Sequence, residues 1–545
     1  MARLVTLEQV AADSPWETLA PGLVESWLKG PDDEKKIQAV LIAASQLFKQ
    51  SGASRALDFL LYSRWLLHCH PLPVMHNILW LCNRLGLEQT AAHTCLDFAR
   101  DAFRMNYVEL GLEAASAALI LDAQADYEIT KSPARSAEVA ALYEQVASSL
   151  LPNSTPPART ARAGGPLRIA LLVPNLVDHV VAYTRRLLNI VRYADPQKYR
   201  LRVYVSENHA VRTSPLFPCG CVEGTTEERG PATLAELRSA GVAVYLGPRQ
   251  LRFGEAAQHL ARQMEQDGTE ALIVQSGLSA PIDWLAARIA RIPVKTAIHI
   301  GSSLFLPDFD ATFYDNPSNI ERENACWPAT GGARQVVQTG VDVKSLDAQQ
   351  AFSRDRFGIP ADAVVIGTLS NHLERRLSEP YLQIIAEALQ KHPQAWFLAF
   401  GSAALPDKMA FFARWGVEDR VRFGGKQSQS GAALKMLDIY ANEFPVGGSN
   451  SVLEAMTCGC PTLAMKWSLV HAESAGAEWV GDPFCIPGPD ATAYAQRLDQ
   501  WLCDKPLRRQ IGQALRQRIL DRFSADQYVA AVLDSVSQLV ESKIG

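Results

Sequence analysis

A run of small and polar residues followed by a carboxylate is the part of this sequence best suited to chemistry. Residues 442–465, NEFPVGGSNSVLEAMTCGCPTLAM, predict a strand end, a glycine turn, a helix and a second strand. We expect Gly447 and Gly448 to supply positive φ and close backbone approach, and Ser449 or Asn450 to cap the helix. The unpaired N–H groups at such a helix start, together with the helix dipole, bind phosphate or diphosphate.

Glu454 is the second chemical group of this segment. It lies one turn into the predicted helix, where a carboxylate can accept hydrogen bonds from two neighbouring ribose hydroxyls. Ser451 joins Gly448, Ser449 and Asn450 in the predicted diphosphate socket. A diphosphate socket and a ribose clamp on one helix are typical of a nucleotide-sugar site. The simpler alternative is a glycine turn that only begins a helix.

The run N-E-F-P-V-G-G-S-N-S-V-L-E resembles the donor-binding segment of glycosyltransferase family 41, which contains O-GlcNAc transferase and the bacterial adhesin N-glycosyltransferases. The bacterial branch has a similar Asn-x-Phe-Pro-x-Gly run and an acidic residue at the position of Glu454. Lys466 and the histidine of Val470-His471-x-Glu473 resemble its lysine and Val-His-x-His pattern, which implies contacts from Lys466 and His471 to donor phosphate or sugar. Val446 stands where the E-x7-E motif of the retaining family 4 has its first glutamate, which favours an inverting transferase.

Other predicted strand ends carry further candidates for donor binding. Arg375 and Arg376 lie in a loop that resembles the lysine-bearing loop of the family, where Glu374 stands at the position of the lysine. Ser402 stands where relatives have a glutamine that contacts the donor, and its reach is shorter. Lys426 follows another strand and would meet the base or the diphosphate. For the arginines and Lys426, the alternative is an ordinary solvated charge.

His179 is the candidate catalytic base on the acceptor side. It follows the first predicted strand of the first sheet, and its location resembles the histidine-bearing loop of the family. Imidazole suits a general base near neutral pH, whereas the alternative is a histidine at a helix start. Asp178 should point elsewhere if the helix has begun, so no dyad is expected. We expect no Asp-x-Asp run in either sheet domain, and therefore no metal clamp on the diphosphate. A UDP-sugar is the expected donor substrate, and no cofactor is expected.

The elements that must position these groups change character along the chain. Residues 1–150 carry apolar residues at helical spacing, which predicts an all-helical domain, tetratricopeptide-like or a bundle. A linker with three prolines and two glycines covers residues 151–165. Strands then alternate with helices, which predicts parallel α/β sheets. Together with the resemblance, this implies the GT-B fold: two Rossmann-like doubly wound domains, residues 166–335 on the acceptor side and 336–545 for the nucleotide sugar.

Composition fits a large enzyme and excludes other classes. The chain has 545 residues, of which 48% are hydrophobic, enough for about three domains of ~150 residues. Its net charge of −5 predicts no general attraction to nucleic acid or anionic lipid. We find no apolar core of a signal peptide and no run of about 18 apolar residues. Ten scattered cysteines without a C-x-x-C pair indicate reduced thiols in a cytoplasmic protein.

These features together predict a metal-independent inverting transferase that moves a hexose, with glucose as the first guess, from a UDP-sugar to a protein side chain. The family implies Asn or Ser/Thr of an adhesin or flagellin as acceptor, with the helical domain gripping that protein. One alternative is a glycan or lipopolysaccharide acceptor. The other is a non-catalytic helical scaffold with a degenerate transferase domain, which the missing family lysine and Ser402 would fit.

Overall fold

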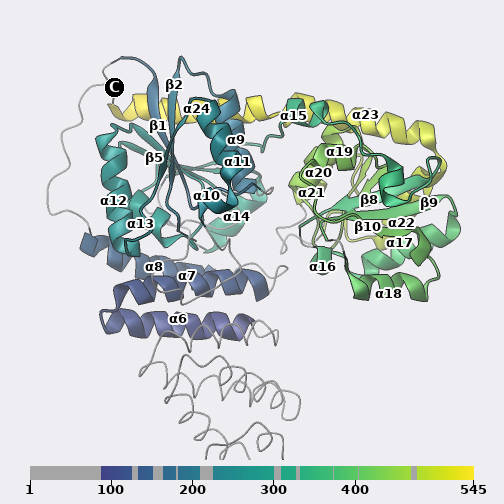
Figure 1. Ribbon diagram of the computed structural model, residues 1–545, viewed down its shortest axis with the longest axis horizontal. Coiled ribbons are helices and arrows are strands. Elements are labelled where there is room, and N and C mark those ends of the chain that lie inside the picture. Colours follow the sequence, from purple (N-terminus) through teal and green to yellow (C-terminus); the bar gives the residue numbers. More distant parts are fainter. Residues whose placement is uncertain are drawn as a thin grey trace, which may run out of the picture.

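Two parallel sheets, each packed between helices, form two bodies that lie side by side in the computed structural model (Figure 1). The prediction of an α/β protein with two Rossmann-like units is therefore confirmed. The structure describes ten stretches of the chain, which are residues 88–125, 133–150, 164–178, 182–208, 225–299, 308–326, 332–371, 373–402, 404–467 and 475–544.

The first sheet has seven parallel strands in the order β3-β2-β1-β4-β5-β6-β7. The order reverses between β1 and β4, and in such sheets ligands bind outside the carboxyl ends of the strands at this point. The short, half-polar β7 is a strand that the sequence did not predict. The strands are β1 (Leu167–Val173), β2 (Tyr199–Val205), β3 (Ala243–Leu246), β4 (Ala271–Val274), β5 (Val294–Ile298), β6 (Ala311–Tyr314) and β7 (Ala333–Val336).

Helices cover both faces of the first sheet because its central strands are apolar on both sides. One face packs against α9, α11 and the C-terminal helix α24, and the other packs against α12 and α13. The helices of this body are α9 (Ala182–Tyr193), α10 (Thr226–Arg229), α11 (Pro231–Ser239), α12 (Phe253–Gln266), α13 (Pro281–Ile289) and α14 (Pro317–Cys326).

Three described helices of the predicted N-terminal domain, α6 (Glu88–Arg104), α7 (Val108–Ala125) and α8 (Pro133–Leu150), lie against the first body (Figure 1). They share one apolar core with α12 and α13. Polar contacts fix the same junction: Glu109 accepts the N–H groups of Phe253 (2.5 Å) and Gly254 (3.0 Å) at the start of α12. Residues 1–87 of the predicted helical domain lie outside the described residues.

The second sheet has five parallel strands in the order β10-β9-β8-β11-β12, which reverses between β8 and β11. Its strands are β8 (Val364–Leu369), β9 (Ala395–Phe400), β10 (Val421–Phe423), β11 (Ile439–Ala441) and β12 (Thr462–Leu463). Its helices are α15 (Val343–Ala348), η1 (Arg354–Phe357), α16 (Leu373–Arg376), α17 (Glu379–Lys391), α18 (Pro406–Arg414), η2 (Glu418–Arg420), α19 (Ser430–Leu434), α20 (Asn450–Thr457), α21 (Ala475–Val480), α22 (Ala491–Cys503) and α23 (Lys505–Arg522).

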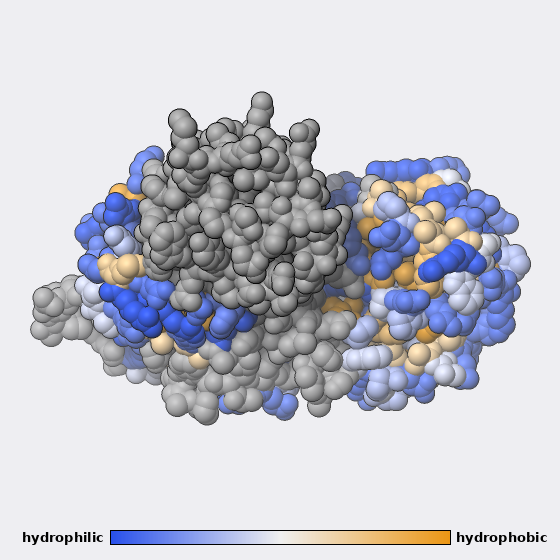
Figure 2. Space-filling model, turned by 90° about the horizontal axis from the view of Figure 1, so that it is seen from below, coloured by the Kyte–Doolittle hydropathy of each residue, from blue (hydrophilic) through white to orange (hydrophobic). Residues whose placement is uncertain are grey.

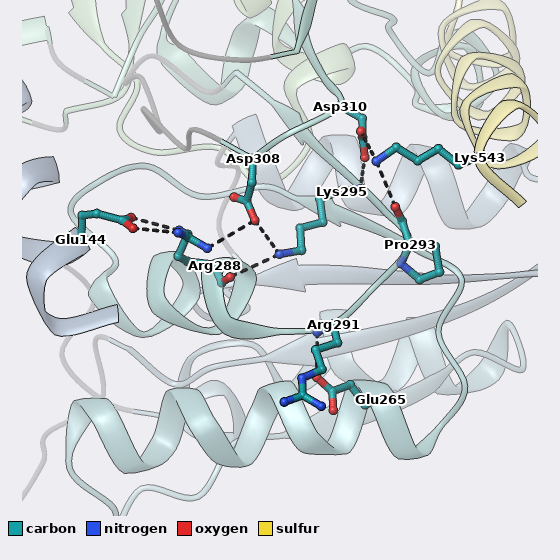
Figure 3. Close-up of polar contacts among 9 residues, drawn as sticks. All are labelled: Glu144, Glu265, Arg288, Arg291, Pro293, Lys295, Asp308, Asp310 and Lys543. Atoms are coloured by element: carbon teal, nitrogen blue, oxygen red, sulfur yellow. Dashed lines mark hydrogen bonds and ion pairs between the residues drawn. The ribbon is translucent and has the colours of Figure 1, made fainter. Parts of the chain in front are cut away.

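The C-terminal helix α24 (Ala525–Ile544) crosses from the second body back to the first. Its apolar side, including Val532 and Val536, is buried in the core of the first sheet. Near its end, Lys543 forms an ion pair with Asp310 and donates to the carbonyl of Pro293 at 3.2 Å (Figure 3). The last helix of the chain therefore ties the two sheets together.

Within the described residues, no helix is both long enough and apolar enough to cross a membrane. On the face of the second body in Figure 2, apolar residues are interspersed with hydrophilic ones.

Candidate active site

The glycine turn after β11 is closed by side chains from the end of that strand. Asn442 Oδ1 accepts the N–H of Gly448 at 2.7 Å, and the carboxylate of Glu443 accepts it at 3.2 Å. Neither Gly447 nor Gly448 has a positive φ, so this part of the prediction is wrong. Close approach is the reason for glycine: a Cβ on Gly447 would lie 2.5 Å from Asn442 Nδ2, and a Cβ on Gly448 would overlap the hydroxyl of Ser451.

The predicted side-chain cap of α20 is also absent. Ser449 occupies the N-cap position, but its hydroxyl makes no capping hydrogen bond and instead accepts from Trp479 Nε1 at 3.0 Å. Asn450 is already the first helical residue, and the hydroxyl of Ser451 accepts from Tyr440 at 2.9 Å. The hydroxyls are thus engaged elsewhere, which leaves the first N–H groups of α20 to a ligand.

Glu454 lies at the domain boundary, only 2% exposed. One of its carboxylate oxygens forms an ion pair with Arg185 of α9, which belongs to the first body. Its other oxygen is buried and has no hydrogen-bond partner among the described residues. Burial lowers the pKa of Arg185 to about 10. A buried carboxylate with one oxygen unpaired is rare in folded proteins and indicates a group held ready for a ligand.

A cavity of about 320 Å³ lies between the two bodies at this ion pair. The first body contributes Arg185, Asn189 and Arg192 to its wall, and the second contributes Asn450 and Glu454. The predicted socket and clamp therefore open onto a cavity that both domains line.

The carboxyl end of β11 also carries Glu443, a second buried carboxylate. It accepts the hydroxyl of Thr368, which lies in β8, and the N–H of Gly448. Burial raises the pKa of Glu443, and the nearby charge of Arg376 opposes this rise. Arg376 is therefore close enough to Glu443 to act on its charge, and its contact with the donor diphosphate stays a prediction. The side chain of Arg375 lies outside the described residues.

Three further predicted donor contacts follow β9, β10 and β12 at the same edge of the sheet. Ser402 donates from its hydroxyl to the carbonyl of Ala404 at 3.3 Å. Lys426 is exposed, and Lys466 lies 3.8 Å from a carboxylate oxygen of Asp482. The structure brings these residues to the predicted edge. There Ser402 bonds within its own loop, and Lys466 is near Asp482, which follows α21.

The two candidate histidines, His179 and His471, lie outside the described residues. Asp178, next to His179, accepts the N–H groups of Ala232 (3.1 Å) and Thr233 (2.8 Å) at the start of α11. Its carboxylate is thus engaged at the start of α11.

Sequence reasoning missed a group of buried amides and hydroxyls at the switch point of the first sheet. Within the part of the chain that the structure describes, three buried polar groups here have no hydrogen-bond partner. Gln275 follows β4, is fully buried, and has both polar atoms of its amide in this state. Asn175 follows β1 and accepts the hydroxyl of Tyr183 at 2.7 Å, but its own NH₂ group is the second. The hydroxyl of Thr184 in α9 is the third. The signal in the sequence was an amide residue within two positions of the end of each of two adjacent strands.

The expectation that the chain lacks an Asp-x-Asp run is wrong, because Asp308-Phe309-Asp310 is one. In Figure 3, both carboxylates point to cations of the protein. Asp308 accepts from Lys295 at 2.8 Å, and Asp310 pairs with Lys543 and accepts the N–H of Lys295. The run precedes β6, at the amino edge of the sheet, whereas ligands bind at the carboxyl edge. This Asp-x-Asp therefore has a structural role.

One described group of side chains has the spacing of metal ligands, His392, Asp499 and Cys503. His392 follows the carboxyl end of α17, at the amino edge of the second sheet and away from the cavity. Asp499 already bonds to His392 (2.5 Å) and Lys391 (2.7 Å).

Comparison with known proteins defines the class. Residues 352–518 match the family described as "Glycosyl transferases group 1". The fold resembles a mutant of the Thermobaculum terrenum O-GlcNAc transferase, with TM-score 0.53, 15% identity, and 97% and 99% of the two chains covered. A glycosyltransferase from Rickettsia africae ESF-5 gives TM-score 0.52, 14% identity, and 69% and 99% coverage. The predictions of a GT-B fold and of a glycosyltransferase are confirmed at this level.

A curated relative adds a local sequence likeness. The chain is 22% identical over 212 residues to N-acetyl-alpha-D-glucosaminyl L-malate synthase of Bacillus anthracis. The match spans 36% of this chain and about half (54%) of that relative.

Proposed function

We propose that this protein transfers a hexose from a UDP-sugar to a protein side chain, with inversion and without a metal ion. The observation that carries the proposal is Glu454, a buried carboxylate with one unpaired oxygen, one turn inside a helix whose first N–H groups are open to a ligand. A ribose on Glu454 would place the nucleotide's diphosphate at the start of α20.

The sequence resemblance of residues 438–473 to family 41 supports UDP-sugar as the donor. The fold likeness to an O-GlcNAc transferase covers 97% of this chain and agrees with the family without identifying donor or acceptor. We place the protein in the cytoplasm, as its scattered cysteines indicate.

The reaction needs few groups. The acceptor oxygen or nitrogen attacks the anomeric carbon, the bond from that carbon to the diphosphate oxygen breaks, and UDP leaves with the electron pair. A base takes the acceptor proton, and His179 is our candidate. The N–H groups of α20 and nearby cations, of which Arg376 is one, neutralise the leaving diphosphate. With this set of donors, no metal is required.

The unpaired amides at the switch point of the first sheet suit the acceptor side. Asn175 and Gln275 offer donors and acceptors that match an amide or hydroxyl group of an acceptor. They lie at the carboxyl edge of the acceptor-side domain, where ligands of such sheets bind.

The first test measures the binding of UDP, GDP and ADP through the shift in the protein's melting temperature. A ligand at 100 times its dissociation constant stabilises the fold by about 2.7 kcal/mol. We expect UDP to stabilise selectively, and Glu454→Ala to abolish the shift. The matched control is Glu387→Ala, which removes an exposed glutamate of α17 in the same domain and should leave the shift unchanged. No shift with any nucleotide would favour the non-catalytic scaffold.

A second candidate function is transfer to a small or glycan acceptor. The observation in its favour is the likeness to a synthase whose name gives L-malate as its acceptor. Incubating the protein with UDP-glucose and either Asn- and Ser/Thr-containing peptides, malate, or oligosaccharides distinguishes the two functions. NMR of the product's anomeric proton tests inversion in either case.

A further inference from the structure

Arg185 and Glu454 connect the two domains through a single ion pair at the edge of the cavity. Arg185 comes from α9 on the acceptor side, whereas Glu454 comes from α20 on the donor side. Under the proposed function, Glu454 receives the ribose hydroxyls. A bound donor and Arg185 then compete for the same carboxylate.

The three arginines of α9 that line the cavity differ in how they are held. Arg186 donates to the carbonyl of His299 at 2.6 Å and pairs with Asp315. Arg192 is held by Glu236 (2.8 Å) and Asp342 (2.7 Å). In the described part of the chain, Arg185 has Glu454 as its one ion-pair partner. It is therefore the arginine that a ligand at Glu454 would release.

A released Arg185 has a second anion within reach. Glu454 follows the first residue of α20 by four positions, which is about 6 Å along the helix axis. A diphosphate on the first N–H groups of α20 would lie within the length of an arginine side chain from Glu454. The planar guanidinium binds phosphate oxygens through two parallel hydrogen bonds.

We propose that Arg185 is a donor-binding residue supplied by the acceptor-side domain, which holds Glu454 in the free protein and moves to the donor's diphosphate when ribose takes its place. The proposal rests on the proposed function and adds a role for the first domain. Donor binding then replaces the Arg185–Glu454 pair by a contact from Arg185 to the diphosphate and one from Glu454 to the ribose. Neither buried charge is left without a partner, and a buried charge without a partner would be destabilising. Arg185 thereby brings a positive charge from the acceptor-side domain to the leaving diphosphate.

The test compares UDP with uridine, which has the ribose but no phosphate, by calorimetry on the full chain. Arg185→Gln should weaken UDP binding by at least tenfold, the size expected for a hydrogen-bonded charge pair. It should leave uridine binding unchanged or tighten it, because the competitor for Glu454 is gone. An effect of the substitution on Glu454 changes the affinities for UDP and uridine by the same factor, so it cancels in the ratio of the two affinities.

Arg192→Gln is the matched control, because it removes the same charge from the same helix and cavity without touching Glu454. It should preserve the affinity ratio. If Arg185→Gln does not fold, Arg185→Lys keeps the charge, loses the bidentate geometry and should lower the ratio by a smaller factor. Equal changes for UDP and uridine would overturn the role of Arg185. Failure of the wild type to bind UDP would instead overturn the proposed function.

Discussion

Asn442 and Gly448 are joined by a 2.7 Å hydrogen bond from the backbone N–H of the glycine to the side-chain oxygen of the asparagine. This bond folds the chain back on the end of β11 so that α20 begins at the cavity between the domains. The carbonyl of Gly448 lies so close to Gly476 that a Cβ there would overlap it. The turn is thus packed on two sides, and its shape depends on residues without side chains.

The first prediction concerns Gly448→Ala. The added methyl group would overlap the hydroxyl of Ser451 and lie 3.1 Å from Asn442 Oδ1, so the turn must shift. Overpacking of this kind costs about 1–3 kcal/mol, and we expect UDP affinity to fall by at least tenfold. Gly459→Ala, in the same domain, meets no atom within 4 Å but has positive φ, so it reports backbone strain alone. Wild-type UDP affinity in Gly448→Ala would show that the turn does not bind the diphosphate.

The second prediction uses the buried carboxyl of Glu443. Its pKa in the folded protein is raised by burial, whereas an unfolded glutamate titrates near pH 4.3. Between the two pKa values the folded state binds more protons, so stability falls as pH rises through this window. The Glu443→Gln protein has no carboxyl group at this position, so it does not lose stability in this way as the pH rises. Its melting temperature should therefore match the wild type near pH 4 and exceed it increasingly as the pH rises.

Thermal melts of both proteins from pH 4 to pH 8 measure this difference. About 1 kcal/mol would shift the melting temperature by ~2–4 °C for a domain of this size. Glu387→Gln, on the exposed side of α17, is the control and should show no pH-dependent gap. A lower melting temperature for Glu443→Gln at pH 7 would mean that the bonds from Thr368 and Gly448 outweigh the burial of charge.

Much of the fold follows from the sequence because buried parallel strands are continuous apolar runs. The four residues of β4 (Ala271–Val274, ALIV) are such a run. β7, with the sequence ARQV, has no apolar run and was missed. At the site, a glycine turn and a carboxylate can be recognised by spacing. The pairing of Arg185 with Glu454 cannot, because it depends on how two domains meet, and nothing in the local sequence of α9 encodes its partner.

The third prediction concerns the Asp-x-Asp run. Asp310→Asn removes the ion pair with Lys543 and should lower thermal stability, since α24 is anchored there. UDP affinity should stay within twofold of the wild type, with or without EDTA, because the run lies at the edge of the sheet opposite the ligand site. Lys543→Ala is the matched variant, and it should destabilise without affecting UDP. Metal-dependent UDP binding that Asp310→Asn abolishes would contradict both the structural role and metal independence.

The last prediction separates stability from function at Gln275. A buried amide with no partner costs about 1–3 kcal/mol, and an apolar group of similar shape removes that cost. Gln275→Leu should therefore keep or raise the melting temperature. If the amide binds the acceptor, transfer to the acceptor found in the screen should fall at least tenfold. UDP affinity and hydrolysis of the donor by water should be unchanged, because neither requires the acceptor. Gln517→Leu, on the exposed side of α23, is the control. A more stable Gln275→Leu protein with undiminished transfer would make Gln275 a packing defect and remove it from the acceptor site.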